Sequence, residues 1–377
     1  MENELGLYVH IPFCKKKCDY CDFASFAEKE NLINDYIESL LKEINFKRVK
    51  NKKIKTIYLG GGTPSYIEEK YIQEILQTIK ENFIVEKNAE ITIEVNPGTV
   101  NLKKLQTYKA LGINRLSIGL QAAQNAILKE IGRIHTYEEF LKTYQDARKI
   151  FDNINVDLMF ALPTQTIKDL QESLEKIVKL NPEHISVYSL ILEEGTILYN
   201  KEASGKLKLP SEKTERQMYW NTKKYLEKNN YIHYEISNFA REGYESKHNM
   251  DCWNQKEYLG VGLGASSYIN KKRFSNITNL NKYIENIQNN EFKKNIILEE
   301  EQDGISQMNE FILLGLRKID GISKTEFYDK FKVDVYEKFG EKFKKLEKLN
   351  LITCDNTKIK LTSKGLDLAN IVWEEFI

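Results

Sequence analysis

The sequence predicts an α/β fold, because short apolar segments typical of strands alternate along the chain with segments of helical periodicity. Most of the strand-like segments are followed directly by a helical one. This order is expected to produce parallel βαβ units with right-handed crossovers, arranged as a partial or closed (β/α) barrel or as an open doubly wound sheet. In both arrangements, functional side chains gather at the carboxyl ends of the strands.

The expected elements follow from these two periodicities in chain order. Alternating or continuous apolar residues predict six strands: Leu5–Ile11, Ile54–Leu59, Glu90–Val95, Arg115–Leu120, Val156–Phe160 and His184–Leu190. Apolar residues at helical spacing predict six helices: Leu32–Arg48, Tyr71–Asn82, Leu102–Leu111, Tyr137–Ile150, Ile167–Leu180 and Ser211–Lys228. The first five helices lie between the strands, as βαβ units require.

The pattern changes after Pro210. The segment Tyr231–Phe239 is short and rich in aromatic residues, and Lys247–Tyr268 contains His, Cys, Trp and several glycines. The segment Lys282–Glu301 is rich in Asn, Lys and Glu, and we interpret it as a linker.

The C-terminal part predicts a winged-helix-like module, a fold that often binds DNA but does not determine function. Its expected elements are three helices and a small hairpin: Met308–Lys318, Lys324–Phe331, Tyr336–Leu349, then Leu351–Thr353 paired with Lys358–Leu361. We therefore expect a barrel domain over residues 1–235, a connecting region over residues 236–300 and this module over residues 301–377.

Composition is that of an ordinary globular protein, with 41% hydrophobic and 29% charged residues in a chain of 377. The 56 Lys and Arg against 55 Asp and Glu leave a net charge of +1, which gives no support to nucleic-acid binding. Five cysteines are too few for a secreted disulfide framework. Neither a signal-peptide pattern nor an apolar span of about 20 residues is present. A cytoplasmic location is therefore expected.

Three of the cysteines, Cys14, Cys18 and Cys21, are spaced C-x3-C-x2-C after the first strand. Three thiolates on one loop can hold three irons of a [4Fe-4S] cluster and leave the fourth iron without a protein ligand. An open coordination position is typical of metal sites that do chemistry. The alternative is a structural zinc site completed by His10 or Asp22, but such sites usually show a second pair of ligands.

Three aromatic residues lie beside these cysteines, namely Phe13, Tyr20 and Phe23. Apolar groups around an iron–sulfur cluster control its access to water and thereby its reduction potential. We expect the three rings to shield the cluster.

Polar or glycine residues follow several of the strands. The run Gly60-Gly-Gly-Thr-Pro64 would allow backbone N–H groups to approach a ligand closely, although a tight turn explains it equally well. Glu94, Gln121 and Asp157 lie near the ends of three strands, where each alone is compatible with a satisfied core or surface group. Arg133 could reach a carboxylate with two hydrogen bonds, although a surface arginine is the commoner case.

The motifs together resemble the radical S-adenosylmethionine superfamily. They are Tyr-Val-His-Ile-Pro-Phe-Cys-x3-Cys-x-Tyr-Cys, Gly-Gly-Gly-Thr-Pro, Ile-Glu-Val-Asn-Pro and Ser-Ile-Gly-Leu-Gln, beginning at Tyr8. Within the superfamily the chain is similar to the coproporphyrinogen III dehydrogenase-like branch, and most to its haem chaperones. The resemblance extends through the C-terminal module and implies a partial (β/α)6 TIM-like radical SAM barrel.

The resemblance also implies the cofactors and their ligands. Cys14, Cys18 and Cys21 would hold the [4Fe-4S] cluster, whose fourth iron S-adenosylmethionine would chelate. Nine residues would contact S-adenosylmethionine: Tyr8, Tyr20, Gly61, Gly62, Thr63, Glu94, Gln121, Arg133 and Asp157. No residue is assigned a catalytic role.

Two departures separate the chain from the true dehydrogenases of this branch. Those enzymes typically carry a further cysteine two residues after the third, where this chain has Phe23. They also have a longer arm ahead of the cluster loop than the segment before Cys14. Both differences count against decarboxylation of a porphyrinogen.

A second patch, Lys247-His-Asn-Met-Asp-Cys-Trp253, is similar to the His-Asn-x-x-Tyr-Trp motif of the haem chaperones, with Cys252 in place of the tyrosine. His248 is the expected axial ligand of haem iron, because neutral imidazole binds it well. Cys252 and Trp253 are further candidate haem contacts. A buried histidine satisfied by hydrogen bonds and a tryptophan in the core are the plainer alternatives, and Cys354 is expected to be an ordinary thiol.

These features predict a haem chaperone that binds haem and transfers it to acceptor haemoproteins, among them membrane-associated respiratory proteins. The alternative is a radical enzyme, namely an oxygen-independent coproporphyrinogen III dehydrogenase or a relative that acts on another tetrapyrrole. A DNA-binding regulator is a third reading, which the net charge of +1 disfavours.

Overall fold

The computed structural model describes residues 4–49 and 52–377. Its centre is a curved sheet in the order β12-β11-β10-β9-β1-β2-β3-β4-β5-β6-β8-β7. Six neighbouring strands pair in parallel and in chain order: β1 (Glu4–Ile11), β2 (Lys53–Gly61), β3 (Ile84–Val95), β4 (Arg115–Gln121), β5 (Ile154–Phe160) and β6 (His184–Ser189). The six predicted strands and their parallel arrangement are confirmed.

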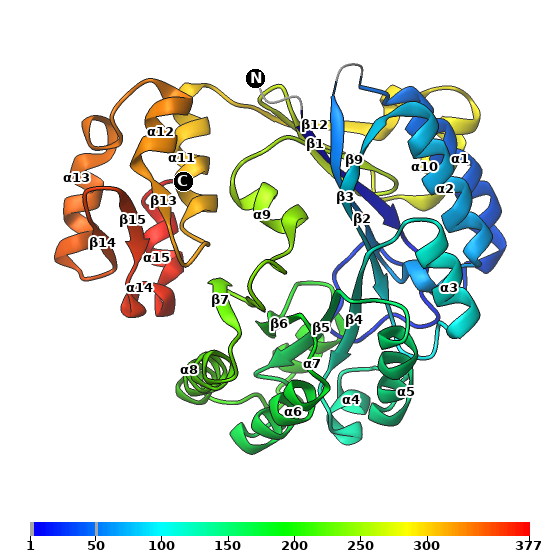
Figure 1. Ribbon diagram of the computed structural model, residues 1–377, viewed down its shortest axis with the longest axis horizontal. Helices are drawn as coiled ribbons and strands as arrows, with labels where there is room; N and C mark the ends of the chain where they lie inside the picture. Colours follow the sequence, from blue (N-terminus) through cyan, green and yellow to red (C-terminus); the bar gives the residue numbers. More distant parts are fainter. Residues whose placement is uncertain (1–3, 50–51) are drawn as a thin grey trace.

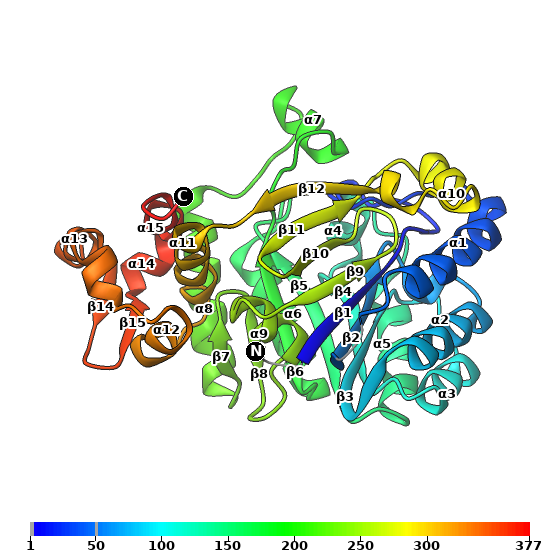
Figure 2. The same cartoon turned by 90° about the horizontal axis from the view of Figure 1, so that it is seen from above.

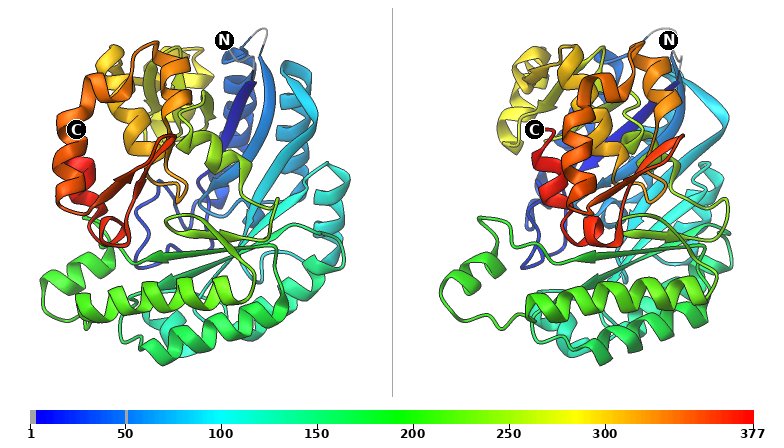
Figure 3. Two further views of the ribbon diagram at one scale, coloured as in Figure 1. Left: turned by 60° about the vertical axis from the view of Figure 1, so that its left-hand side comes forward. Right: turned by 90° about the vertical axis from the view of Figure 1, so that its left-hand side faces the viewer.

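Helices cover the outer face of this sheet (Figures 1 and 3). They are α1 (Ile33–Phe46), α2 (Glu69–Asn82), α3 (Leu102–Ala110), α5 (Tyr137–Arg148), α6 (Ile167–Leu180) and α8 (Glu212–Lys228). Each corresponds to a predicted helix to within a few residues. Between these elements lie two short helices that were not predicted, α4 (Asn125–Glu130) and α7 (Ile197–Ala203), because neither is long enough to show a periodic apolar face.

The interpretation of Lys282–Glu301 as a linker is wrong. This part of the chain forms α10 (Leu280–Gln288), a short 3-10 helix over Phe292–Asn295 and β12 (Ile296–Glu301). The helix packs on α1 with Tyr283 and Ile287 buried, and β12 adds an edge strand to the sheet, as Figure 2 shows from above. Polar residues dominate its composition because a helix and an edge strand on the surface each bury only one face.

The remaining strands of the sheet come from the region between α8 and α10. They are β7 (Ile232–Glu235), β8 (Asn238–Ala240), β9 (Tyr258–Val261), β10 (Ser266–Ile269) and β11 (Lys272–Asn276). Strand β9 pairs in parallel with β1, whereas β8 pairs antiparallel with β6. Both edges of the parallel sheet are thereby covered, and the barrel stays partial.

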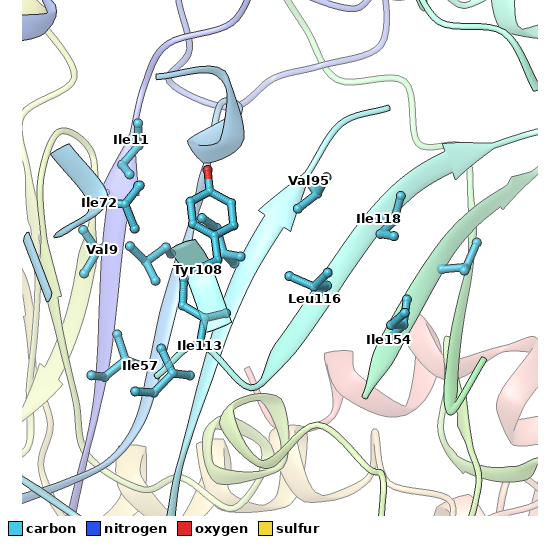
Figure 4. Close-up of a cluster of buried hydrophobic side chains, with 14 of the residues drawn as sticks. Val9, Ile11, Ile57, Ile72, Val95, Tyr108, Ile113, Leu116, Ile118 and Ile154 are labelled. Atoms are coloured by element: carbon cyan, nitrogen blue, oxygen red, sulfur yellow. The ribbon is translucent and has the colours of Figure 1, made fainter. Parts of the chain in front are cut away.

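Two faces of the parallel strands differ in polarity because successive side chains alternate. The apolar set packs against the helices, as Figure 4 shows for residues of the strands and of the helical layer: Val9, Ile11, Ile57, Ile72, Val95, Tyr108, Ile113, Leu116, Ile118 and Ile154. The opposite set on β4 is Arg115, Ser117, Gly119 and Gln121, which line a cavity inside the barrel. The fold therefore encloses a polar interior.

The C-terminal residues build a smaller module with a hydrophobic core of its own. It contains α11 (Gly304–Gly315), α12 (Lys324–Phe331), α13 (Val335–Lys348), α14 (Ser363–Asp367) and α15 (Ala369–Glu374) around a sheet in the order β13-β15-β14. These strands are β13 (Ile322–Ser323), β14 (Ile352–Cys354) and β15 (Lys358–Leu361), the last two being the predicted hairpin. The domain limits at residues 235 and 300 stay a prediction.

No helix within residues 4–49 and 52–377 is long and apolar enough to cross a membrane.

Glu43 on α1 connects the first barrel unit to the region that contains β9, β11 and α10. Its buried carboxylate forms an ion pair with Lys47 and accepts hydrogen bonds from the Gly262 amide, Asn276 and Tyr283. Glu43→Leu leaves the nearly buried Lys47 ammonium without its carboxylate, so we expect the free energy of unfolding to fall by about 3–5 kcal/mol. Denaturant unfolding measures this loss. The matched control on the same helix is Glu38→Leu, at an exposed position, and an equally small change in both variants would contradict the assignment.

Candidate functional site

The cysteine loop folds back on itself directly after β1. The amide of Phe26 donates to the Pro12 carbonyl at 2.7 Å, and the amide of Cys14 donates to the Phe26 carbonyl at 2.9 Å. The amide of Asp19 donates to the Ile131 carbonyl at 3.1 Å, which attaches the loop to the end of α4. Backbone hydrogen bonds therefore hold the loop over the carboxyl ends of the strands.

Each of the three cysteines is a free thiol with one polar neighbour of its own. The Thr63 hydroxyl lies 3.5 Å from Cys14 Sγ, and Ser25 Oγ lies 3.8 Å from Cys21 Sγ. Arg133 Nη1 lies 3.6 Å from Cys18 Sγ. Hydrogen-bond donors at the sulfurs are the usual means by which a protein tunes an iron–sulfur cluster, so the set fits one.

His10 is unsuited to complete a zinc site with these cysteines. Its Nε2 lies 2.8 Å from the Ala24 carbonyl and its Nδ1 lies 3.0 Å from the Tyr8 hydroxyl, so both ring nitrogens have partners. Burial lowers the pKa of His10, partly offset by the hydrogen bond to Ala24. The other candidate, Asp22, is exposed. These contacts disfavour the zinc alternative.

The expectation that three aromatic rings shield the cluster holds only in part. Tyr20 lines the cavity beside the cysteines. Phe13 instead packs in the main core against Tyr36, with ring centroids 5.4 Å apart. Phe23 is 61% exposed at the mouth of the cavity. Sequence proximity to the cysteines did not determine where the Phe13 and Phe23 rings point.

The glycine turn after β2 packs tightly against the cysteine loop. A Cβ at Gly62 would lie 2.9 Å from the Phe13 carbonyl oxygen and 3.0 Å from Cys14 Sγ, and Gly61 has φ +112°. The amides of Gly61, Gly62 and Thr63 already donate to Glu94, Ile11 and Phe13. These N–H groups therefore have internal acceptors in the ligand-free protein, and their contact with a ligand stays a prediction.

Eight of the nine residues predicted to contact S-adenosylmethionine line one cavity of about 490 Å³, together with the three cysteines. The eight are Tyr20, Gly61, Gly62, Thr63, Glu94, Gln121, Arg133 and Asp157. They come from the loops after β1, β2 and α4 and from β3, β4 and β5. Parallel strands end at one rim, which explains why residues so distant in sequence meet there.

Tyr8 is the ninth, and it is not among the described residues that line the cavity. Its hydroxyl forms a hydrogen bond with His10 Nδ1, and its ring stacks on the Tyr58 ring with centroids 6.3 Å apart. Tyr58 lines the cavity instead. A contact between Tyr8 and S-adenosylmethionine is therefore not supported by the geometry.

Glu94 is the buried acid of the site. Tyr58 donates to one carboxylate oxygen at 2.9 Å, and the Gly61 amide donates to the other at 3.2 Å. Burial raises the pKa of Glu94 to about 7, and the negative charge of Asp157 adds to the rise, although the two hydrogen bonds oppose it. A cationic ligand group beside this carboxylate would return it to the ionised form.

Arg133 points inward and is not a surface arginine. Its Nη2 donates to Asn96 Oδ1 and to the Gly119 carbonyl, each at 2.8 Å. Asp157 accepts hydrogen bonds from Ser117 at 3.1 Å and from Asn155 at 2.7 Å. Both side chains are thus oriented before any ligand binds.

The side chain of Gln121 indicates that a polar ligand binds in the cavity. Its Oε1 is buried without a hydrogen-bond partner, and its backbone has φ +71°, in the left-handed region. A buried acceptor without a partner is costly, so a polar group of a ligand is expected there. The orphaned acceptor, the cavity and the three free thiols together fit S-adenosylmethionine bound beside a cluster.

Sequence reasoning missed several polar residues of the cavity: Tyr58, Asn96, Arg115, Ser117, Asn155, Ser186 and Asn249. Most of them lie directly next to an apolar core position on the same strand. Polar residues recurring at every second position of an otherwise apolar strand were the signal that could have identified them.

The second motif forms α9 (Lys247–Trp253), which lies at the amino-terminal side of the barrel strands between the sheet and the C-terminal module (Figure 1). The carboxylate of Glu90 accepts from the amides of Lys247 and His248, each at 3.1 Å, and so caps the helix. His248 Nδ1 lies 2.8 Å from the Thr56 hydroxyl inside the barrel. Burial, and then the charge of Arg115, lower the pKa of His248 to about 4.

The other two haem candidates have different neighbours from His248. The guanidinium of Arg317 lies 4.4 Å from the Trp253 ring centroid, so this ring borders the C-terminal module. Burial raises the pKa of the Cys252 thiol to about 12, with a further contribution from Asp251. Haem contacts of Cys252 and Trp253 stay a prediction.

Comparison with known proteins agrees with this geometry. A family model described as the radical SAM superfamily matches residues 8–177, and one described as the HemN C-terminal domain matches residues 303–368. The "Heme chaperone HemW" of Lactococcus lactis subsp. lactis (strain IL1403) is 38% identical over 378 residues, covering 100% of this chain and 98% of that protein. This chain belongs to the HemW family. The family member from Bacillus subtilis (strain 168) is 35% identical and covers 98% of both chains.

A solved structure extends the comparison from the HemW family to its wider branch. The coproporphyrinogen III oxidase HemN from Escherichia coli, described as a radical SAM enzyme, has a TM-score of 0.87 and 25% sequence identity. The match covers 100% of this chain and 90% of HemN. The predicted fold class and the predicted place within the radical SAM superfamily are confirmed.

Proposed function

We propose that this HemW family member is a haem chaperone, which binds haem and transfers it to acceptor haemoproteins while carrying a [4Fe-4S] cluster and S-adenosylmethionine. The observation that carries the proposal is the 38% identity to a heme chaperone along the whole chain. All five cysteines are free, as is usual in a reducing compartment, and we place the protein in the cytoplasm. Membrane-associated respiratory proteins are proposed acceptors, and no nucleic-acid partner is proposed.

The residues of the cavity have distinct proposed roles toward the cofactors. Cys14, Cys18 and Cys21 hold the cluster, and Glu94 accepts a hydrogen bond from the amino group of S-adenosylmethionine. Gln121 offers its free oxygen to a hydroxyl or amine of the same ligand. Bound together, the cluster and S-adenosylmethionine supply one-electron reductive chemistry. The enclosing strands limit the access of water to this site.

We propose further that the protein does not convert coproporphyrinogen. Phe23, where a fourth loop cysteine would stand, is 61% exposed and offers no ligand for iron. The reconstituted protein is therefore expected to yield no protoporphyrinogen when it is incubated anaerobically with coproporphyrinogen III, S-adenosylmethionine and a reductant. Product formation accompanied by 5′-deoxyadenosine would instead establish the dehydrogenase activity.

His248 is the proposed axial ligand of haem. Its lowered pKa keeps the imidazole neutral at pH 7, which is the form that binds iron. Because Nδ1 is engaged with Thr56, Nε2 is the nitrogen that would face the metal. The imidazole is only 7% exposed, so haem must either reach it from the cavity or displace α9.

His248→Ala is expected to weaken haem binding more than about tenfold, which corresponds to about 1.4 kcal/mol, because an axial ligand is lost. Titration of the protein with haem, followed by the Soret band, measures the change. The control is His233→Ala. This variant removes another buried histidine, which lies in β7 and stacks on Phe239 of β8. Equal Soret spectra and affinities for wild type and His248→Ala would remove His248 from the haem site.

A further inference from the structure

Arg115, at the start of β4, is a buried arginine whose side chain has no partner among the described residues. It is 2% exposed, and its Nε is buried without a hydrogen-bond acceptor. Within residues 4–49 and 52–377 its guanidinium forms no hydrogen bond and no ion pair. A buried charge is costly unless it is paired, so an anion is expected to complete this position.

Two other arginines of the barrel domain show how a guanidinium is satisfied within this chain. Arg133 donates to Asn96 and to the Gly119 carbonyl, and Arg148 forms a two-pronged ion pair with Glu183. Arg115 has no comparable acceptor, although its side chain lines the cavity. The difference indicates that the partner of Arg115 comes from outside the chain.

The acids of the same interior are already engaged elsewhere. Glu94 accepts from Tyr58 and the Gly61 amide, and Asp157 accepts from Ser117 and Asn155. Glu90 caps α9 through the amides of Lys247 and His248. None of these carboxylates neutralises Arg115. Neutral polar side chains also line the cavity: Asn155, Ser186, Asn238 and Asn249.

Arg115 also lies at the opposite end of β4 from the residues proposed to hold S-adenosylmethionine. Arg115 begins β4 and Gln121 ends it, so a rise of about 3.3 Å per residue separates them by about 20 Å along the strand. Arg115 pairs in register with Thr92, two residues before Glu94 on the neighbouring strand. The cavity therefore extends from the end proposed to bind the cofactors to an opposite end, where the cationic side chain of Arg115 lies.

We infer that Arg115 binds a carboxylate at the floor of the cavity, and that this carboxylate is a propionate of the tetrapyrrole cargo. The inference rests on the proposed haem-binding function, because haem carries two propionates. A guanidinium matches a carboxylate with two parallel hydrogen bonds. Binding would convert an unpaired buried charge into a paired one.

The experiment compares haem with haem dimethyl ester, in which both carboxylates are blocked, by titrating the whole reconstituted protein. Wild type should bind haem at least about tenfold more tightly than the ester, as expected for charge-assisted hydrogen bonds. Arg115→Met should weaken haem binding by a similar factor and leave the ester unaffected. Lys17→Gln, which removes one positive charge at the cavity mouth, should leave the ratio between the two ligands unchanged.

Thermal unfolding of the ligand-free protein separates this role from a structural one. Because Arg115 has no partner, Arg115→Met should unfold at the wild-type temperature or above it, whereas a structural arginine predicts a clear decrease. If the Met variant does not fold, Arg115→Lys should still weaken haem binding and spare the ester, because the two-pronged geometry is lost.

The outcomes distinguish the inference from the function on which it rests. No binding of either tetrapyrrole by wild type would remove the proposed haem-chaperone function itself. Equal binding of haem and its ester by wild type would overturn the inference and leave the function standing. A third outcome is that haem and its ester bind alike, while sodium propionate raises the unfolding temperature of wild type but not of Arg115→Met. Arg115 would then bind a free carboxylate, and its assignment to a propionate of the tetrapyrrole would be wrong.

Discussion

Alanine at Cys14, Cys18 or Cys21 is expected to abolish the visible absorption of the anaerobically reconstituted protein and to reduce its iron and sulfide content far below about four of each per chain. Three cysteines are the fewest that can hold a [4Fe-4S] cluster with one open iron, so the loss of any one removes the site. The structure strengthens this expectation, because each sulfur has its own polar neighbour: Thr63, Arg133 or Ser25.

The controls for this experiment are the two cysteines outside the loop. Cys252→Ala and Cys354→Ala should retain the full spectrum, since both thiols lie in other parts of the fold and burial raises the pKa of each. A loop variant with an unchanged spectrum, or a loss of iron in Cys354→Ala comparable to that in the loop variants, would refute the ligand set.

Glu94→Gln is expected to weaken S-adenosylmethionine binding by about 10- to 100-fold, as for the loss of a charge-assisted hydrogen bond in a buried site. The wild-type affinity should also depend on pH. Burial raises the pKa of Glu94 to about 7 in the ligand-free protein, whereas a cationic amino group requires the ionised carboxylate. Affinity should therefore rise as the pH increases from about 5 to about 7 and then level off.

Stability of the ligand-free protein should show the opposite pH dependence. The folded Glu94 keeps its proton up to a pKa of about 7, and the unfolded carboxyl loses it near the ordinary glutamate pKa of 4.5. Between these values the folded state binds more protons, so the free energy of unfolding contributed by Glu94 falls as the pH rises. Glu94→Gln should abolish both dependences.

Equilibrium binding of S-adenosylmethionine and thermal unfolding, each measured from pH 5 to pH 8, test these statements. Glu81→Gln, at an exposed position at the end of α2, is the matched control and should behave as wild type. A wild-type affinity that is independent of pH, or that is unchanged in Glu94→Gln, would exclude Glu94 as the partner of the amino group.

The barrel could be predicted because its signals are local. Strand β4 alternates inward polar and outward apolar residues, and α6 coincides with its predicted range Ile167–Leu180. Prediction failed at Lys282–Glu301, where the polar composition suggested a linker although Leu280, Tyr283, Ile284 and Ile287 recur at helical spacing and form a buried face. The burial of that face depends on α1, more than 200 residues earlier in the chain.

The same distinction between local and long-range signals applies to the residues of the site. Cysteine spacing and strand-end positions identified the loop and the acids, because parallel strands bring their ends to one rim. Tyr8 could not be separated from Tyr58, since both rings lie on neighbouring strands and only packing decides which one reaches the cavity. Arg115 could not be recognised as unpaired, because a sequence does not reveal which acids are already engaged by Tyr58, Ser117 or the α9 amides.

Transfer of haem tests the central claim most directly. The reconstituted protein is loaded anaerobically with haem, separated from free haem, and mixed with an apo-haemoprotein while the Soret region is recorded. A chaperone predicts a shifted Soret band on loading, followed by the spectrum of the holo-acceptor and loss of the band from the donor. The absence of a shifted band on loading, or retention of all haem by the donor in the presence of acceptor, would contradict the account.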